Sequence, residues 1–320
     1  MKHLKLLAVA APLALFATTA SADTFVRMVS GPAGGSWYPI GAKIAEVWGK
    51  DVKGIATSNG PGGGVGNVKD VNKGEAEVGW SYGHTVFEGW QAGTGFDKET
   101  KNVRHLATLY PAAMQTAVPK DSKIMSYADL KDKNISPGKA QWSGFAAYQM
   151  IVNEYGYSTD DVKKGGGTVH HVSYSDSVAL MKDGHIDAFA GLTSYPQASF
   201  LDLEFSPGIR LLPIEEDVLN KILKRNPGYI RVELTNEHYK SVNGSVPTLG
   251  AVTVLVVNKD LPDDVVYQMT KSLWDNHGEF VKVKKVWETV QLKNALLGAA
   301  VPVHPGAQKY YDEKGVKAAM

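Results

Sequence analysis

The chain has 320 residues, 43% of them hydrophobic, no cysteine, and 34 basic against 33 acidic side chains, a formal net charge of +1. The lack of cysteine excludes disulfides, thiolate metal sites and cysteine nucleophiles. A nearly neutral chain without a run of lysine or arginine also lacks the positive surface that nucleic-acid binding needs, so any recognition of an anion must be local.

Residues 1–22 have the pattern of a secretory signal peptide. Lys2 and Lys5 precede an apolar segment over 6–16, and small residues at 20–22 form a cleavage site, so we expect cleavage after Ala22 and export to the periplasm. The apolar segment is too short to span a bilayer as a helix, and no later segment has the length needed.

From residue 24 onward, short apolar strands alternate with amphipathic helices, which is typical of an α/β fold with a mainly parallel sheet. Apolar residues at helical spacing predict helices over 37–48 and 65–71. The strands predicted in this first part lie at 24–29, 54–57, 76–80 and 103–109.

A second block begins after Pro119 and continues the alternation. Its predicted elements are helices at 127–130, 145–155 and 176–182 and strands at 134–136, 169–172 and 187–190. Residues 212–247 have an irregular pattern, although the acidic residues at 215–217 are typical of a helix N-terminus. Residues 249–257 give the strongest strand signal, because they are mostly β-branched and apolar.

From Pro262 the chain is predicted to be helical, with apolar stripes that need a surface to cover. The first block is the simplest such surface. We therefore predict two lobes with a ligand cleft between them: lobe 1 comprises 23–115 and 250–320, and lobe 2 comprises 116–249. Each lobe is expected to be a mainly parallel sheet flanked by helices.

Two glycine-rich loops, at 30–36 and 57–67, each lie between a predicted strand and a predicted helix. Glycine lets the backbone approach a ligand closely, and the amides at a helix N-terminus carry partial positive charge, so the pair suits a small anion. The glycines at 60–66 fit neither the dinucleotide fingerprint nor the P-loop. Nearby aromatic residues beside serines suit the apolar wall of a ligand pocket, namely Trp37, Tyr38, Tyr82 and Trp142.

No catalytic signature is present in the sequence. Ser143 lacks the preceding glycine of a nucleophile elbow, and the adjacent His170 and His171 would point to opposite faces of a strand and so could not bind one metal together. We expect a protein that is not an enzyme and has no cofactor and no metal. The alternative is a secreted hydrolase that uses Ser143 or His84.

Several segments, in this order along the chain, resemble the solute receptors of tripartite ATP-independent periplasmic (TRAP) transporters, of the TAXI (TRAP-associated extracytoplasmic immunogenic) family. They are Gly34-Gly-Ser-Trp-Tyr-Pro-Ile-Gly41, the glycine-rich stretch that ends at Asn67, and residues 74–79, 126–131, 136–144, 181–189 and 266–271. The resemblance implies a monomeric, two-lobed type II periplasmic binding protein. Such a receptor closes on a small carboxylate, for example 2-oxoglutarate, another C4 or C5 dicarboxylate or glutamate, and delivers it to TRAP membrane permease subunits.

Carried over from the family, the ligand-binding positions lie on loops of both lobes. They are Ser36, Trp37, Tyr38, Asn59, Gly63, Asn67, Ser81, Tyr82, His84, Gln141, Trp142, Ser143, Gly144, Phe145 and Ser194.

The segment after Gly79 departs from the family pattern, because Trp80-Ser-Tyr-Gly-His84 stands where an aspartate suited to an amino group is common. We therefore expect a keto acid or a simple dicarboxylate rather than glutamate. Arg27, Arg104 and Lys139 are the candidate cations, with surface or structural roles expected for each. A receptor for an ABC importer is the alternative, since the sequence does not show the contact with the permease.

Overall fold

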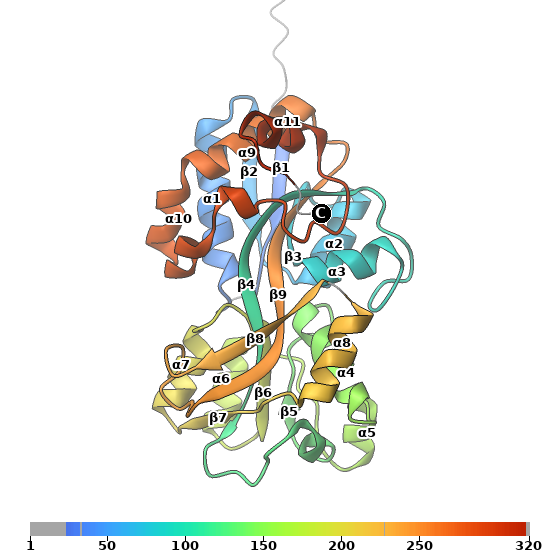
Figure 1. Ribbon diagram of the computed structural model, residues 1–320, viewed down its shortest axis with the longest axis vertical. Helices are drawn as coiled ribbons and strands as arrows, with labels where there is room; N and C mark the ends of the chain where they lie inside the picture. The colour runs from blue at the N-terminus through green and yellow to red at the C-terminus, as the bar shows by residue number, and fades with distance from the viewer. Residues whose placement is uncertain (1–23, 33, 227, 318–320) are drawn as a thin grey trace, which may run out of the picture.

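The computed structural model describes residues 24–317 with the exception of 33 and 227. The predicted signal peptide, 1–22, lies outside the described residues. Figure 1 shows two lobes, joined by the long strands β4 (Val103–Pro119) and β9 (Ser245–Asn258), which run through both. This arrangement confirms the two-lobed α/β fold predicted from the sequence.

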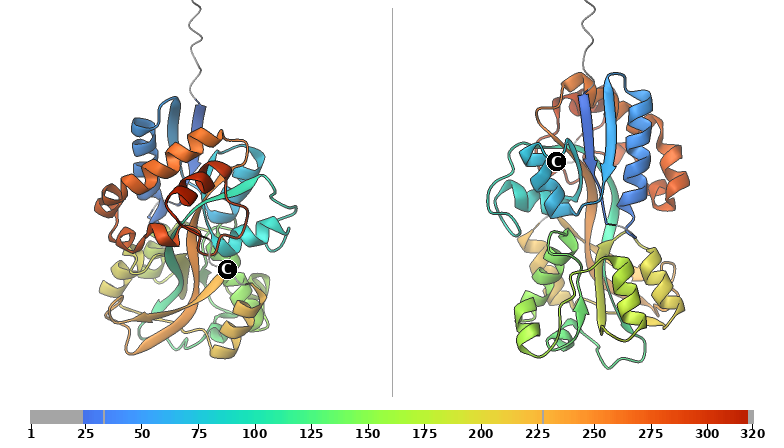
Figure 2. Two further views of the ribbon diagram at one scale, coloured as in Figure 1. Left: turned by 45° about the horizontal axis from the view of Figure 1, so that its top comes forward. Right: turned by 180° about the vertical axis from the view of Figure 1, so that it is seen from behind.

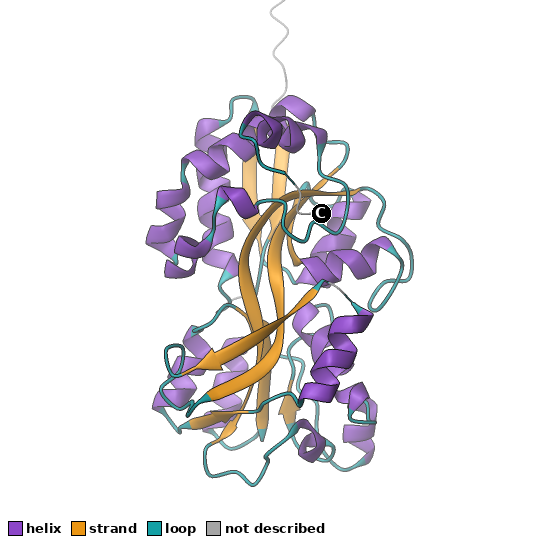
Figure 3. Ribbon diagram, viewed as in Figure 1, coloured by secondary structure: helices purple, strands orange, loops and turns teal. Residues whose placement is uncertain are grey.

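The strands form one continuous sheet with the order β2-β1-β3-β9-β4-β6-β5, while β7 pairs with β4 and β8 pairs with β9. Figure 3 shows the helices flanking these strands in both lobes. The remaining strands are β1 (Thr24–Val29), β2 (Ile55–Gly60), β3 (Val78–Tyr82), β5 (Ile135–Ser136), β6 (Ala188–Thr193), β7 (Ile209–Leu211) and β8 (Tyr229–Thr235).

The sheet is mixed, whereas the sequence predicted a mainly parallel one. Strand β1 is parallel to β2 and β3, and β5 is parallel to β6. Strand β9 is antiparallel to β3, β4 and β8, and β4 is antiparallel to β6 and β7. The difference has a simple cause: the chain passes between the lobes once in each direction, and these two passages pair with each other.

The lobe at the top of Figure 1 contains β1, β2 and β3 together with the first and last helices of the chain. Helix α1 buries Ile40, Ile44 and Trp48, which are four residues apart and so share one helix face. Figure 2 shows α1 beside β1 and β2 when the molecule is seen from behind. The helices of this lobe are α1 (Trp37–Asp51), α2 (Gly64–Lys73), α3 (Gly83–Trp90), α9 (Asp263–Asp275), α10 (His277–Val283) and α11 (Pro305–Glu313), with the 3-10 turns η2 (Lys285–Thr289) and η3 (Leu292–Asn294).

In the second lobe, serine N-caps determine where several helices begin. Ser126, Ser158 and Ser173 each form a capping box with the aspartate three residues later, so two of the free backbone amides at each start are satisfied. The elements of this lobe are η1 (Tyr127–Leu130), α4 (Ser143–Glu154), α5 (Thr159–Lys164), α6 (Tyr174–Lys182), α7 (Ala198–Phe205) and α8 (Glu216–Arg225).

Two of the predicted elements were wrong. Residues 212–247 are not irregular: they contain α8 and then β8, which pairs along its whole length with β9. The acidic residues at 215–217 do begin a helix, as predicted, with Glu215 as its N-cap. Residues 169–172 form no strand, only an isolated bridge between Ile135 and Val169.

The return of the last helices to the first block agrees with the expected chain path, since α9 packs against α1 and α11. The lobe boundaries at 115/116 and 249/250 stay a prediction. Over the described residues, no helix is long and apolar enough to cross a membrane.

Candidate ligand-binding site

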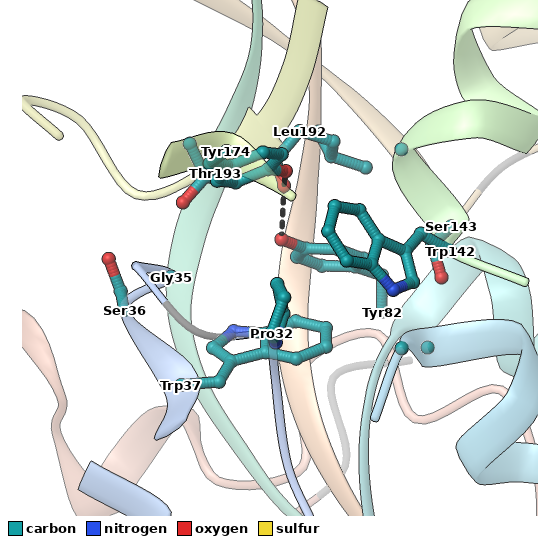
Figure 4. Close-up of a pocket in the computed structure, with 13 residues that line it drawn as sticks. Pro32, Gly35, Ser36, Trp37, Tyr82, Trp142, Ser143, Tyr174, Leu192 and Thr193 are labelled. Atoms are coloured by element: carbon teal, nitrogen blue, oxygen red, sulfur yellow. Dashed lines mark hydrogen bonds between the residues drawn. The ribbon is translucent and has the colours of Figure 1, made fainter. Parts of the chain in front are cut away.

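A cavity lies where the two lobes meet (Figure 4). Segments from both lobes line it: Pro32, Gly35, Ser36, Trp37, Gly63, Gly64, Tyr82, Trp142, Ser143, Gly144, Tyr174, Leu192 and Thr193.

Helix N-termini converge on this cavity. The lining includes the N-caps and first residues of α1, α2 and α4, and the N-cap of α3, Tyr82. None of these four helices has a side-chain cap at its N-terminus, in contrast to the capping boxes of α5 and α6. Gly66 N and Phe145 N already donate to the carbonyls of Gln141 and Trp142, and the other amides of these first turns are left for a ligand. Their partial positive charge favours an anion.

No charged side chain is present among the described residues that line the cavity. The three candidate cations lie elsewhere. Arg27 forms an ion pair with Glu77 at 2.6 Å, the guanidinium of Arg104 lies 5.9 Å from the centre of the Trp90 ring, and Lys139 is exposed. The described lining therefore offers a ligand helix N-termini, hydroxyl groups and the indole N–H groups of Trp37 and Trp142.

Four aromatic side chains form most of the wall. The rings of Trp37 and Tyr82 are 4.6 Å apart, and those of Trp142 and Tyr174 are 5.3 Å apart at 86°. Both tyrosine hydroxyls donate to the carbonyl oxygen of Leu192, at 2.8 Å from Tyr82 and 3.4 Å from Tyr174; the dashed line in Figure 4 reaches the Tyr82 hydroxyl. Burial raises the pKa of Tyr82 well above its usual value, so this phenol stays protonated.

The lobes are closed against each other around the cavity. The hydroxyl groups of Ser36 and Ser194 are 2.6 Å apart, and the Thr85 hydroxyl donates to Ser143 Oγ at 2.8 Å. Gln197 Nε2 donates to the carbonyl of Gly34 at 2.9 Å. Each of these bonds joins a segment of the first lobe to a segment of the second.

Two glycines of the second loop make this approach possible. A Cβ on Gly63 would lie 2.0 Å from Trp142 Cδ1, and one on Gly64 would lie 2.0 Å from Ser143 Oγ. Side chains are excluded at both positions while the lobes are closed. The glycine content of this loop therefore serves contact between the lobes as well as exposure of amides.

The structure brings seven of the predicted site residues into the lining: Ser36, Trp37, Gly63, Tyr82, Trp142, Ser143 and Gly144. Two more are adjacent to it. Ser194 contacts Ser36, and the carbonyl of Gln141 accepts a hydrogen bond from Gly66 N at 3.2 Å.

The other predicted residues lie outside the lining. Asn67 is buried and donates to the carbonyls of Ser30 and Trp80, while its oxygen accepts from Gly63 N, so it holds the two loops in place. Ser81 donates to the carbonyl of Gly64.

His84 is fully enclosed and stacks on Tyr229 at 3.9 Å; burial lowers its pKa to about 3, so the ring is neutral. The ring of Phe145 packs edge-on against His171, Tyr38 is 38% exposed, and Asn59 donates to the carbonyl of Tyr38.

Six lining residues were not predicted: Pro32, Gly35, Gly64, Tyr174, Leu192 and Thr193. The first three belong to the two glycine-rich loops and could have been included with them. Tyr174 has one weak signal, since it follows the Ser173 cap of α6. Leu192 and Thr193 end strand β6, and no feature of the sequence indicates that they reach the cavity.

The model of a family described as the NMT1-like family matches residues 28–315. The chain therefore belongs to the NMT1-like family.

Several solved structures are similar to this chain. XAC2383 from Xanthomonas citri, bound to chloride ion, is 12% identical, with 90% of this chain and 95% of that chain covered and a TM-score of 0.50. A structure titled a periplasmic transporter is 13% identical over 90% and 92%, with a TM-score of 0.50. The substrate binding protein of an amino acid ABC transporter is 15% identical over 82% and 99%, with a TM-score of 0.45. At such identities the likeness extends to the fold alone.

Proposed function

We propose that this protein is a periplasmic solute-binding protein that captures a small carboxylate between its lobes and delivers it to a membrane transporter. The observation that carries the proposal is the convergence of uncapped helix N-termini on a cavity between lobes that has no charged side chain in its described lining. Backbone amides and hydroxyls would hold the carboxylate, and their hydrogen bonds to it strengthen when closure removes water.

Closure would be a hinge motion of lobe 1, 23–115 with 250–320, against lobe 2, 116–249. Strands β4 and β9 pass between the lobes and would bend. Their pairing has register shifts between Thr108 and Pro111, close to this crossing. Such irregularities locally disrupt a ladder and bend its strands, so they are a suitable place for the hinge.

The hydrolase alternative finds little support in the contacts of Ser143. Its hydroxyl accepts from Thr85, and it is Thr85 that lies 3.0 Å from His84 Nε2. A nucleophile needs a base within direct hydrogen-bond reach, and here a threonine stands between the two. This arrangement favours a binding protein over an enzyme.

The transporter that receives the ligand has two candidates. The resemblance of the sequence segments supports TRAP permease subunits. An ABC importer is the second candidate, because the binding protein of an amino acid ABC transporter is among the similar folds. A neighbouring gene for a multi-span permease without an ATPase supports the first candidate, and a neighbouring ATPase gene supports the second.

A thermal-shift panel of keto acids, dicarboxylates, amino acids and sulfonates tests the proposal. A ligand at a hundred times its dissociation constant should add roughly 2.7 kcal/mol to the free energy of unfolding. Because no cationic side chain lines the described cavity, affinity should change little between low and moderate salt. Failure of every small anion to stabilise the folded protein would refute the proposal, and turnover of an ester that is lost in Ser143→Ala would favour the hydrolase.

A further inference from the structure

The Ser143 hydroxyl connects the wall of the cavity to a buried histidine in the other lobe. Ser143 is the first residue of α4, lines the cavity and is 2% exposed. Its Oγ accepts a hydrogen bond of 2.8 Å from the hydroxyl of Thr85, in the first turn of α3. Thr85 Oγ1 in turn lies 3.0 Å from Nε2 of the preceding residue, His84. Thr85 and His84 are both buried, and neither lines the cavity.

The direction of each bond in this chain follows from the number of protons available. A threonine hydroxyl has one proton, and Thr85 gives it to Ser143. Thr85 Oγ1 can therefore only accept from His84, so Nε2 carries a hydrogen. Burial lowers the pKa of His84 to about 3, so the ring is neutral and has no second N–H. Nδ1 is then a bare nitrogen, in agreement with its lack of a hydrogen-bond partner among the described residues.

This chain leaves the proton of Ser143 unused. Within the described part of the chain, Ser143 Oγ has no hydrogen bond other than the one from Thr85. One of its lone pairs is occupied by that bond, so its own proton is confined to the remaining directions. Because Ser143 lines the cavity, a ligand there can supply the acceptor. A ligand that presents only donors at this position, such as an ammonium group, would leave the buried proton unpaired, which is costly.

We propose that Thr85 is a positioning residue for ligand binding: it holds the Ser143 hydroxyl so that its proton is directed into the cavity and donated to an acceptor oxygen of the ligand. The group beside Ser143 is then a carboxylate, keto or sulfonate oxygen rather than an ammonium or an amide N–H. This inference rests on the proposed function and adds to it a residue outside the cavity lining. Since the bond from Thr85 to Ser143 joins the two lobes, the alignment of the proton accompanies closure.

Calorimetry of the mature protein tests the inference with four probes: 2-oxoglutarate, succinate, pyruvate and methanesulfonate. Near neutral pH the polar atoms of all four are acceptor oxygens. Thr85→Val keeps the shape of the side chain and removes the hydroxyl, whereas Thr85→Ser keeps the hydroxyl. His84 and Thr85 lie on the same helix, so we expect the loss of their mutual bond to affect the open and closed forms alike and to cancel in the affinity.

For each probe that binds the wild type, we expect Thr85→Val to bind about fivefold more weakly and Thr85→Ser within about twofold of the wild type. Ser143→Ala should bind at least about twentyfold more weakly, because it loses both the bond from Thr85 and the bond to the probe. The double variant, Thr85→Val with Ser143→Ala, should match Ser143→Ala, since Thr85 acts only through Ser143. Melting curves establish that each variant is folded.

Two results would overturn the inference and leave the proposed function standing. Equal losses in Thr85→Val, Ser143→Ala and the double variant would mean that the bond only holds the lobes together. Additive losses would mean that Thr85 acts independently of Ser143. If none of the probes binds the wild type, the proposed function fails and the inference fails with it.

A crystal structure of the wild type with a bound probe gives a test that needs no variant. We expect an oxygen of the probe within about 3.2 Å of Ser143 Oγ. A carbon atom of the probe beside Ser143, or a probe bound away from this hydroxyl, would overturn the inference.

Discussion

Single residues in the second glycine-rich loop decide how closely the lobes can approach. Gly64 and Gly66 lie in the same turn of α2, yet they differ sharply in their surroundings. A Cβ on Gly64 would lie 2.0 Å from Ser143 Oγ of the other lobe, whereas the nearest atom to a Cβ on Gly66 is 3.8 Å away, an ordinary contact. The two glycines therefore form a matched pair for testing closure.

We expect Gly64→Ala to weaken ligand binding, since a methyl group at this position would lie 2.0 Å from Ser143 Oγ of the other lobe in the closed arrangement. Overpacking of this kind costs about 1–3 kcal/mol, which corresponds to a loss of roughly five- to 150-fold in affinity. Gly66→Ala should bind normally. Calorimetry measures both variants; equal affinities would contradict the closed arrangement.

His84 gives the stability of the protein a dependence on pH. Burial lowers its pKa to about 3, while the unfolded chain has the ordinary value near 6.5. The folded state favours the neutral ring, so its contribution is complete above pH 6.5 and is lost as the pH falls from there toward 3. At pH 5 the loss is about 2 kcal/mol for this residue alone.

Replacement by phenylalanine keeps an aromatic ring on Tyr229 and removes the titrating group. Urea unfolding of His84→Phe should therefore lose less stability between pH 7 and pH 5 than the wild type does. His105, whose pKa burial lowers to about 4, still titrates in both proteins, as do His238 and His304, whose pKa values burial also lowers, and these groups contribute to the remaining slope. Identical pH slopes for the two proteins would refute this account of His84.

At the scale of elements, helix α2 organises the cavity through one buried side chain. Asn67 donates to the carbonyls of Ser30 and Trp80, both at 2.7 Å, and accepts from Gly63 N at 2.9 Å. It thereby connects the end of β1, the strand β3 and the start of its own helix. The two glycine-rich loops are therefore held in place by Asn67, which lies outside the cavity lining, rather than by the ligand.

Asn67→Ala leaves these three backbone groups without their partner in a buried place. We expect the free energy of unfolding to fall by roughly 2–4 kcal/mol. Asn153→Ala, at an exposed position of α4, should have a much smaller effect and serves as the control. Similar urea midpoints for the two variants would show that Asn67 has no such structural role.

Most elements were predictable because their patterns are local. Helix α1 repeats its buried residues every four positions, and β9 is a continuous apolar strand. Strand β8 was missed because charged residues, Arg231 and Glu233, interrupt it, and its pairing with β9 decides its structure. In the site, residues on the glycine-rich loops could be predicted from the sequence. Tyr174 and Thr193 could not, because they reach the cavity only through the packing of α6 and β6.

At the scale of the whole molecule, contacts between the lobes extend beyond the cavity. Asn226, at the end of α8, donates to Glu88 Oε1 of α3 at 2.7 Å, and neither residue lines the cavity. Figure 1 shows α8 and α3 facing each other across the junction of the lobes. This bond stabilises the closed form without touching the ligand.

Glu88→Ala and Asn226→Ala should each weaken ligand affinity by about 1–2 kcal/mol, roughly five- to thirtyfold, through the population of the closed form. The double variant should be little weaker than either single one, because the same bond is lost. Stopped-flow tryptophan fluorescence should show the change mainly in the dissociation rate. Fully additive losses would mean that the two residues act independently.

The uncharged lining has a consequence for the proton balance of binding. The described cavity wall contains no group that titrates near neutral pH: its only ionisable side chains are Tyr82 and Tyr174, and burial raises the pKa of both. A carboxylate ligand is itself fully ionised at pH 7.5. Capture should therefore neither take up nor release protons, and the heat of binding at that pH should be the same in phosphate and in Tris, two buffers with very different ionisation enthalpies. The protein would then bind its ligand in the periplasm as an intact anion. The positive charge that balances this carboxylate during transport would have to come from the transporter.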